Sequence, residues 1–373
     1  MPGKNLHLIS FDVPFPPDYG GVIEVFYKIK ALHEAGIKVH LHCFHYGRLK
    51  HKELENICES VNYYPRKTTK SLLFNGLPYI VLSRSGEELK KNLLKNNYPI
   101  VMEGLHSTFY LNDNALQNRK TIVRTHNIEH LYYENLANVE KNIFKRYYFY
   151  NEASKLKKYE SVLERASLIA AISQNDTSYF SSILPNVQYI PAFHPHENIN
   201  IREGKGNFVF YHGNLSIGEN NEAALFLVNK VFPALRNIPL VIAGSKPSRE
   251  LIKAVRSHKH VELKAGISTR EIYELIAGAQ INVLPTFQST GIKLKLLASL
   301  FTGRHCIVNT PMVENTGLES LCHVTDNVEE MRKKIKKLFE NEFTVKDTIK
   351  RKQVLEEQFS NKKSAEKLIK AIY

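Results

Sequence analysis

The sequence has few cysteines and lacks the spacing that would tie them to a metal or to each other. Its four cysteines, Cys43, Cys58, Cys306 and Cys322, form no C-x-x-C pair. Neither a zinc site nor a disulfide framework is therefore indicated. We interpret the four residues as reduced, mostly buried thiols of a cytoplasmic protein.

Long hydrophobic runs are also absent. The 373 residues contain no apolar window long enough to span a bilayer, which would take about 18 residues. The first residues, MPGKNLHLISFD, lead into a strand-like run without the apolar stretch and cleavage site of a signal peptide. We therefore expect any membrane contact to be peripheral, at the inner face of the membrane.

The sequence has fewer acidic residues than basic ones. The chain has 51 Lys and Arg against 37 Asp and Glu, a net charge of +14. Such a charge indicates an anionic partner, whether nucleic acid, a membrane surface or a phosphate-bearing ligand. We expect no nucleic-acid partner, because the sequence has no zinc finger, RNP-like strand or basic zipper and its charge is not confined to one tail.

Short apolar runs alternate with longer amphipathic stretches along the whole chain. The runs lie at 6–11, 39–44, 61–65, 99–104, 121–127 and 167–173, and again at 207–214, 240–244, 261–266, 281–285 and 306–309. Continuous apolar runs are typical of buried parallel strands, and their alternation with helices predicts an α/β fold of doubly wound domains.

A break in this pattern divides the chain. Residues 191–207 hold two prolines, two glycines and no apolar periodicity, which is typical of a linker. We predict an N-terminal domain at 1–192, a linker at 193–206 and a C-terminal domain at 207–350. We expect the helices of 351–373 to pack back on the N-terminal domain.

Polar residues stand where two apolar runs of the first domain end. Glu103 and His106 follow one run, and Arg124 and His126 close the next. Ligands bind at the carboxyl ends of parallel strands, so Glu103 and His126 are candidates for proton transfer or for hydrogen bonds to a sugar or phosphate. The alternative is structural histidines; we expect no metal site, because the i, i+4 helical spacing with an added carboxylate is missing.

Glycines mark a second candidate feature. Gly20 and Gly21 stand at an expected helix start, where free backbone N–H groups favour an anion. The alternative is a tight turn. The pattern is not G-x-G-x-x-G, so no nicotinamide cofactor is indicated.

In the second domain, the stretch LPTFQSTGIKLKLLASLF carries the strongest signal. We expect a helix to begin at Gly291, with Lys293 and Lys295 in about its first turn. Cations there oppose the helix dipole, and a bound diphosphate would explain them. The alternative is a solvated helix face.

The motifs DYGGVIEVFYKIKALHEAG, RTHNIEHLYY, AISQNDTSYF, YHGNLS, VIAG, LKAGIS and STGIKLKLLASLFTGRHCIVN, in this order, resemble a glycosyltransferase of the GT-B architecture, within the retaining family 4. The resemblance implies two Rossmann-like domains facing across a cleft, with the N-terminal domain on the acceptor side and the C-terminal domain binding the nucleotide sugar. It also implies metal-independent, hexosyltransferase-type transfer with retention. The donor would be a UDP- or GDP-linked sugar, and the acceptor a saccharide or lipid-linked hydroxyl in surface polysaccharide or glycolipid synthesis.

The same resemblance implies roles for single residues. His126, with Glu103, would contact the transferred sugar, and Gly20 and Gly21 would approach the donor phosphate or border the acceptor. In the second domain, the donor would be bound by residues after the strands, namely Gly213, Asn214, Gly266, Ile267, Ser268, Thr290, Gly291, Ile292, Lys293 and Lys295.

One departure from the family stands out. The family pairs two glutamates eight positions apart, the second of which binds the donor ribose, whereas this chain has Thr290 and Ala298. A charge-assisted hydrogen bond worth about 1.5–3 kcal/mol is lost, unless Thr290, Ser299 or Glu314 replaces it. A non-catalytic binding paralogue and a nucleotide-sugar epimerase of the same architecture are therefore alternative functions.

Lysines and aromatic residues interleave at 141–160. This pattern predicts a long helix, either with a face for an anionic membrane or with a core face and merely solvated lysines.

Overall fold

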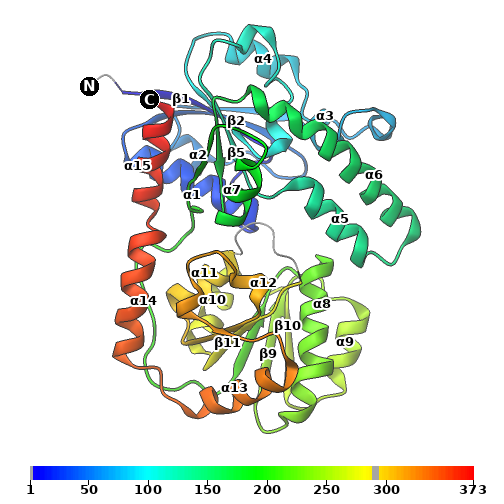
Figure 1. Cartoon of the computed structure of the whole chain (residues 1–373), viewed down its shortest axis with the longest axis vertical. Coiled ribbons are helices and arrows are strands. Elements are labelled where there is room, and N and C mark those ends of the chain that lie inside the picture. Colours follow the sequence, from blue (N-terminus) through cyan, green and yellow to red (C-terminus); the bar gives the residue numbers. More distant parts are fainter. Residues whose placement is uncertain (1–2, 288–293) are drawn as a thin grey trace. The chain divides into compact units, whose positions relative to one another are not determined.

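The computed structural model describes residues 3–287 and 294–373, which form two compact units (Figure 1). Unit 1 comprises residues 3–195 and Phe359–Tyr373, and unit 2 comprises residues 196–287 and 294–358. Each unit is built on a parallel sheet with helices on both faces. The predicted α/β class is confirmed.

Unit 1 contains a seven-stranded sheet in the order β3-β2-β1-β4-β5-β6-β7. Its strands are β1 (Asn5–Ser10), β2 (Lys38–His45), β3 (Ser60–Pro65), β4 (Ile100–Glu103), β5 (Thr121–Thr125), β6 (Leu168–Ala171) and β7 (Val187–Tyr189). Its helices are α1 (Gly20–Glu34), α2 (Lys52–Glu55), α3 (Tyr79–Leu82), α4 (Glu87–Leu93), α5 (Glu129–Val139), α6 (Ile143–Tyr159), α7 (Gln174–Ser181) and α15 (Asn361–Ile372). The strand order reverses between β1 and β4, the position at which doubly wound sheets bind ligands.

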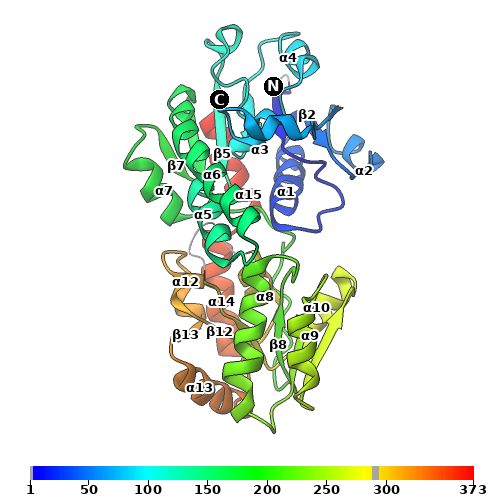
Figure 2. The same cartoon turned by 90° about the vertical axis from the view of Figure 1, so that its right-hand side faces the viewer.

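Both faces of this sheet are buried. Leu6 and Leu8 of β1 pack with α1 and with Leu368 of α15, whereas Ile9 points to the opposite face, which α6 covers through Leu156. This alternation within a fully buried strand explains why the strands appear in the sequence as continuous apolar runs. The C-terminal helix α15 lies beside α1 (Figures 1 and 2).

Unit 2 repeats the arrangement with six parallel strands in the order β10-β9-β8-β11-β12-β13. These are β8 (Val209–His212), β9 (Leu240–Gly244), β10 (Val261–Ala265), β11 (Ile281–Leu284), β12 (His305–Val308) and β13 (His323–Val324). The helices are α8 (Gly218–Phe226), α9 (Arg249–Arg256), α10 (Thr269–Gly278), α11 (Leu294–Thr302), α12 (Thr310–Val313), α13 (Val328–Glu340) and α14 (Val345–Gln358). The order reverses between β8 and β11, so the ends of these strands are the counterpart of the β1 and β4 ends.

Short helical turns complete both units. They are η1 (Lys70–Phe74), η2 (Leu105–Ser107), η3 (Asn114–Leu116), η4 (Glu160–Arg165), η5 (Leu227–Val231), η6 (Phe232–Ala234) and η7 (Glu319–Leu321). None of the helices that the structure describes is long and apolar enough to cross a bilayer.

The predicted strands are all present, but β7 and β13 were not predicted. Both are too short to form an apolar run, with three and two residues. All four cysteines are free thiols, of which Cys43 and Cys306 are buried and Cys58 and Cys322 are partly exposed.

Candidate functional site

A charged network is buried beneath the carboxyl ends of β4 and β5 in unit 1. Helix α1 contributes Glu24 and Lys28, one turn apart on the face that packs on the sheet. Glu103 closes β4, and Arg124 lies in β5. All four side chains are at most 1% exposed, so each must find its partner within the protein.

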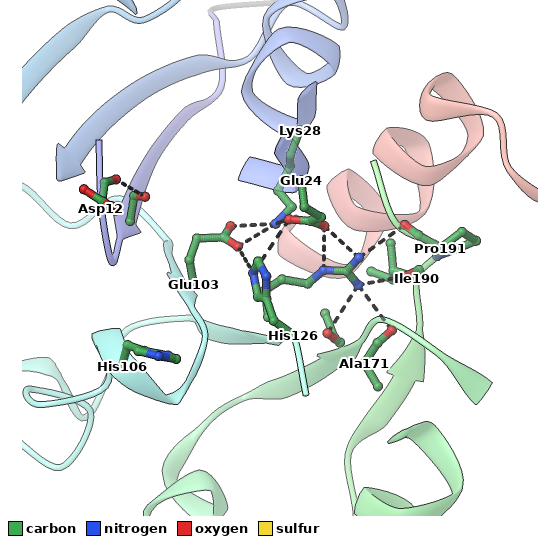
Figure 3. A network of polar contacts seen from close by, with 12 residues as sticks. Asp12, Glu24, Lys28, Glu103, His106, His126, Ala171, Ile190 and Pro191 are labelled. Carbon is green, nitrogen blue, oxygen red and sulfur yellow. Dashed lines mark hydrogen bonds and ion pairs between the residues drawn. The ribbon is translucent and has the colours of Figure 1, made fainter. Parts of the chain in front are cut away.

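Lys28 lies at the centre of this network (Figure 3). Its Nζ donates to Glu24 Oε2 at 2.7 Å and to both carboxylate oxygens of Glu103 at 2.7 Å. The ammonium therefore joins helix α1 to the end of β4.

Arg124 binds the second carboxylate oxygen of Glu24. Its Nε and Nη2 donate to Glu24 Oε1 at 2.9 and 2.8 Å, and its Nη1 donates to the carbonyl oxygen of Ile190 at 2.6 Å. Two carboxylates thus face two cations. Burial alone would raise the pKa of Glu24, but Lys28 and Arg124 outweigh it and hold this pKa at about 2.

His126 follows β5 and connects the network to the surface. Its Nε2 lies 2.9 Å from Glu103 Oε2, and its side chain is 9% exposed. Because the Glu103 carboxylate accepts from Lys28 through both oxygens, Nε2 of His126 is the donor in this pair. In the neutral ring, Nδ1 then carries the lone pair, which is the form that accepts a hydrogen bond or a proton from a hydroxyl group.

The structure brings the two predicted residues Glu103 and His126 into contact at the strand ends, whereas Glu24 and Lys28 were not predicted. Among the described residues, the ligand atoms of Glu24, Glu103 and His126 lie within 4.8 Å of one another, close enough to hold a metal ion. The Lys28 ammonium already occupies the position between the two carboxylates. A divalent ion would have to displace it, so these residues fit an internal cation better than a metal.

Gly20 and Gly21 begin α1, as predicted, yet their surroundings differ. A Cβ atom on Gly20 would meet nothing within 4 Å, whereas one on Gly21 would lie 2.7 Å from Cζ of Phe11. Gly21 is thus explained by packing against Phe11. Only Gly20 leaves space beside the backbone.

The other polar residues after these strands form separate pairs. His130 Nδ1 lies 3.3 Å from Glu160 Oε1. Burial and the nearby Asp176 raise the pKa of Glu129 to about 8. Burial and Arg84 lower the pKa of His106 well below its usual value. None of these residues bonds to the Lys28 network in the described part of the chain.

In unit 2, the loop after β8 is closed by Asn214. Its Oδ1 accepts from Ser216 Oγ at 2.7 Å and from Ser245 Oγ at 2.8 Å. A Cβ atom on Gly244 would overlap the carbonyl oxygen of Gly213, so the ends of β8 and β9 pack backbone to backbone. Asn214 therefore shapes the loop.

Asn220 of α8 joins this loop to Lys295 of α11. Its Nδ2 donates to the Asn214 carbonyl oxygen at 3.1 Å, and its Oδ1 accepts from Lys295 Nζ at 2.9 Å. The ammonium also lies 5.4 Å from the ring centroid of Tyr211. Gly213, Asn214 and Lys295 are thus brought together, through an asparagine that the sequence did not single out.

Four of the predicted donor-binding residues lie outside the described residues, and so does the expected helix start at Gly291. They are Thr290, Gly291, Ile292 and Lys293.

Gly266, Ile267 and Ser268 follow β10, from which β8 is separated by β9. Ser268 caps α10: its N–H and Oγ donate to Glu271 Oε2 at 2.8 and 2.7 Å. Its backbone N–H is therefore already bonded within the protein.

Ala298, which stands where the resemblance expects a glutamate, lies in an apolar cluster with Phe210, Ala243 and Ile276. A glutamate at this position would bring a charged group into this apolar cluster, which costs several kcal/mol unless the carboxylate is paired. The neighbouring Ser299 Oγ is buried and has no hydrogen-bond partner among the described residues. Glu314 is exposed at the end of α12.

Solved structures share this architecture along the whole chain. The crystal structure of TarM superposes with a TM-score of 0.70 at 11% identity, covering 99% of this chain and 98% of TarM. A glycosyltransferase from Rickettsia africae gives 0.68 at 12% identity, with 100% and 98% covered. A UDP-forming α,α-trehalose-phosphate synthase from Burkholderia xenovorans gives 0.65 at 8% identity, with 99% and 100% covered. The chain therefore has the GT-B fold, as predicted.

The chain is also similar to an uncharacterized 44.6 kDa protein in the cps region of Klebsiella pneumoniae. The two are 27% identical over 328 residues, which cover 83% of this chain and 84% of the relative. No protein-family model matches the chain, and membership of family 4 stays a prediction.

Proposed function

We propose that the chain is a glycosyltransferase that moves a sugar from a UDP- or GDP-linked donor to a hydroxyl group of a saccharide or lipid-linked acceptor. The observation that carries the proposal is that each unit has a pair of interacting polar side chains, either at strand ends or early in the helices that follow strands: Glu103 with His126 in unit 1, and Asn220 of α8 with Lys295 of α11 in unit 2. The fold is shared with sugar-transferring proteins, and a solved complex of S. aureus TarM contains UDP and α-GlcNAc-glycerol. The relative in a cps region supports a role in surface polysaccharide or glycolipid synthesis.

The proposed chemistry assigns one task to each pair. Lys295 stabilises the leaving diphosphate in place of a divalent metal, together with Lys293, whose role stays a prediction from the sequence. His126, oriented by Glu103, binds a hydroxyl group of the transferred sugar through Nδ1. Transfer proceeds with retention, and the departing phosphate helps to take the acceptor proton. The protein works in the cytoplasm.

Calorimetric titration with UDP and GDP tests the donor site. We expect Lys295→Ala to weaken binding of the preferred nucleotide about 10- to 100-fold, the value of one charge-assisted hydrogen bond. Lys264→Ala is the matched control, because Lys264 is a unit 2 lysine engaged in an exposed ion pair with Glu262. Equal affinities for all three proteins would refute the assignment of Lys295.

A second function, binding of a sugar or nucleotide without transfer, is favoured by the apolar surroundings of Ala298. In that case the nucleotide would bind but no donor sugar would be consumed. Turnover of any nucleotide sugar rejects this alternative.

A further inference from the structure

Apolar side chains are concentrated on the surface where α5 turns into α6. We call residues 139–150 the α5–α6 tip. No other stretch of the described chain exposes as many large apolar side chains, which here are Val139, Ile143, Phe144, Tyr147 and Tyr150. Monomeric proteins seldom expose such a group of residues without a partner for it.

The three most exposed of these side chains share one helix face. Phe144 is 86% exposed, Tyr147 is 74% exposed and Ile143 is 69% exposed. Tyr147 follows Phe144 by three residues and Ile143 by four, the spacings at which helical side chains are neighbours. The result is a compact apolar ridge on the first turns of α6.

The tip is held in place from its inner side. Tyr133 of α5 packs edge to face on Phe149 of α6, with ring centroids 6.0 Å apart. Tyr150 donates from its hydroxyl group to Asn138 Oδ1 at 2.7 Å. Helices α5 and α6 lie side by side in unit 1 (Figure 1), so the ridge is presented by a packed helical hairpin and not by a frayed end.

The charge around the ridge is basic. Lys141, Lys145 and Arg146 are exposed within the tip, against one acidic residue, Glu140. The first turn of α6 has no acidic residue, although acidic side chains there would stabilise the helix and cations oppose its dipole. The stability of helix α6 therefore does not explain why these cations lie at its start. Binding to an external anionic surface does explain their position.

We propose that the α5–α6 tip docks the protein on a membrane that contains anionic lipids. The ridge of Ile143, Phe144 and Tyr147 enters the headgroup region, and Lys141, Lys145 and Arg146 meet the lipid phosphates. Aromatic rings flanked by lysine and arginine suit this boundary, because such side chains have an apolar body and a polar or charged end. The inference goes beyond the proposed function and holds whether or not the chain transfers a sugar.

The absence of tryptophan from the chain gives a direct test. Phe144→Trp introduces a single tryptophan at the ridge, and Val345→Trp introduces one at an exposed apolar position on α14 of unit 2. On addition of phosphatidylglycerol-containing vesicles at low salt, we expect a blue shift of the emission for Phe144→Trp and none for Val345→Trp. An unchanged spectrum for Phe144→Trp would overturn the proposal.

Vesicle sedimentation measures the contribution of the charges. The double variant Lys145→Gln/Arg146→Gln should bind about 25-fold more weakly, since each cation near an anionic surface contributes about fivefold. Lys158→Gln, a change at the far end of α6, is the matched control and should bind as the wild type does. Equal binding of all three proteins contradicts the proposal. So does a wild-type dimer that Phe144→Ser dissociates, because a second copy of the chain would then be what covers the ridge.

Discussion

The two glycines at the start of α1 illustrate how neighbours in the sequence differ in surroundings. Gly20 has open space where a Cβ atom would stand, whereas the missing Cβ atom of Gly21 makes room for Phe11. A ligand that approaches the backbone here therefore depends on Gly20, and the packing of α1 depends on Gly21.

Alanine substitutions should separate these two roles. Gly21→Ala is expected to lower the free energy of unfolding by about 1–3 kcal/mol, the usual cost of overpacking. Gly20→Ala should change it by less than about 1 kcal/mol but should weaken binding of a phosphate-bearing ligand. Urea unfolding followed by ligand titration measures both effects, and equal losses of stability would show that the environments do not differ.

At the scale of single residues, the sequence predicted Glu103 and His126 but not their partners. Polar residues at the end of an apolar strand are visible in the sequence, because they interrupt a run. Glu24 and Lys28 were hidden in a helical pattern, where charged residues usually face water. Their i, i+4 spacing in a helix that proves to be buried against the sheet is the signal that could have found them.

Helix α1 is an element with two functions, since it packs on β1 and carries half of the buried ion network. Among the described residues, Lys28 is the only lysine or arginine within hydrogen-bond distance of Glu103. Removing one partner of a buried ion pair is far more costly than removing the whole pair.

Lys28→Met should therefore lower the free energy of unfolding by about 3–5 kcal/mol, because it leaves a buried carboxylate without its cation. The double variant Lys28→Met/Glu103→Gln removes that carboxylate charge as well and should recover part of the loss. Urea denaturation of the wild type, both single variants and the double variant gives the coupling energy. A double variant whose loss equals the sum of the single losses would argue against the network.

At the scale of elements, the apolar runs predicted the strands well, because strands buried on both faces leave no polar residue to obscure them. Strands β7 and β13 were not predicted, because they are short and lie at the edges of their sheets. Ser268 shows a second limit of prediction from the sequence. Its place after β10 was predicted, but its capping-box hydrogen bonds with Glu271 depend on where α10 begins.

Buried neutral histidines are spread over the whole molecule. In unit 1, burial lowers the pKa of His7 and His194 to about 4 and that of His42 to about 3. In unit 2, burial lowers the pKa of His212 to about 3. Each stays neutral in the native state at a pH where the unfolded chain, with a pKa near 6.5, takes up a proton.

Stability should therefore fall as the pH drops from 7.5 to 5.5, because the unfolded state binds more protons in this range. Each histidine contributes a loss of about 1.4 kcal/mol. Glu129, with its raised pKa of about 8, acts in the opposite direction and offsets part of the loss. Urea unfolding at the two pH values measures the net change, and greater stability at pH 5.5 would contradict the neutral, buried state of these histidines.

The net charge of +14 is also a property of the whole molecule, and the basic residues that contribute to it lie in several different environments. Lys28 and Arg124 neutralise buried carboxylates, Lys295 lies at the proposed donor site, and Lys145 and Arg146 are exposed on the α5–α6 tip. Composition alone indicates an anionic partner but does not separate internal pairing from a ligand site or a docking surface.

The central claim, sugar transfer from a nucleotide donor, is tested most directly by following labelled UDP- and GDP-sugars in the presence of saccharide and lipid-linked acceptors. The account predicts that one donor releases its nucleoside diphosphate while the labelled sugar appears in the acceptor. His126→Ala should slow this transfer by at least about 100-fold and leave nucleotide binding intact. The account would be contradicted if no donor were consumed, or if the sugar were epimerised while still attached to its nucleotide.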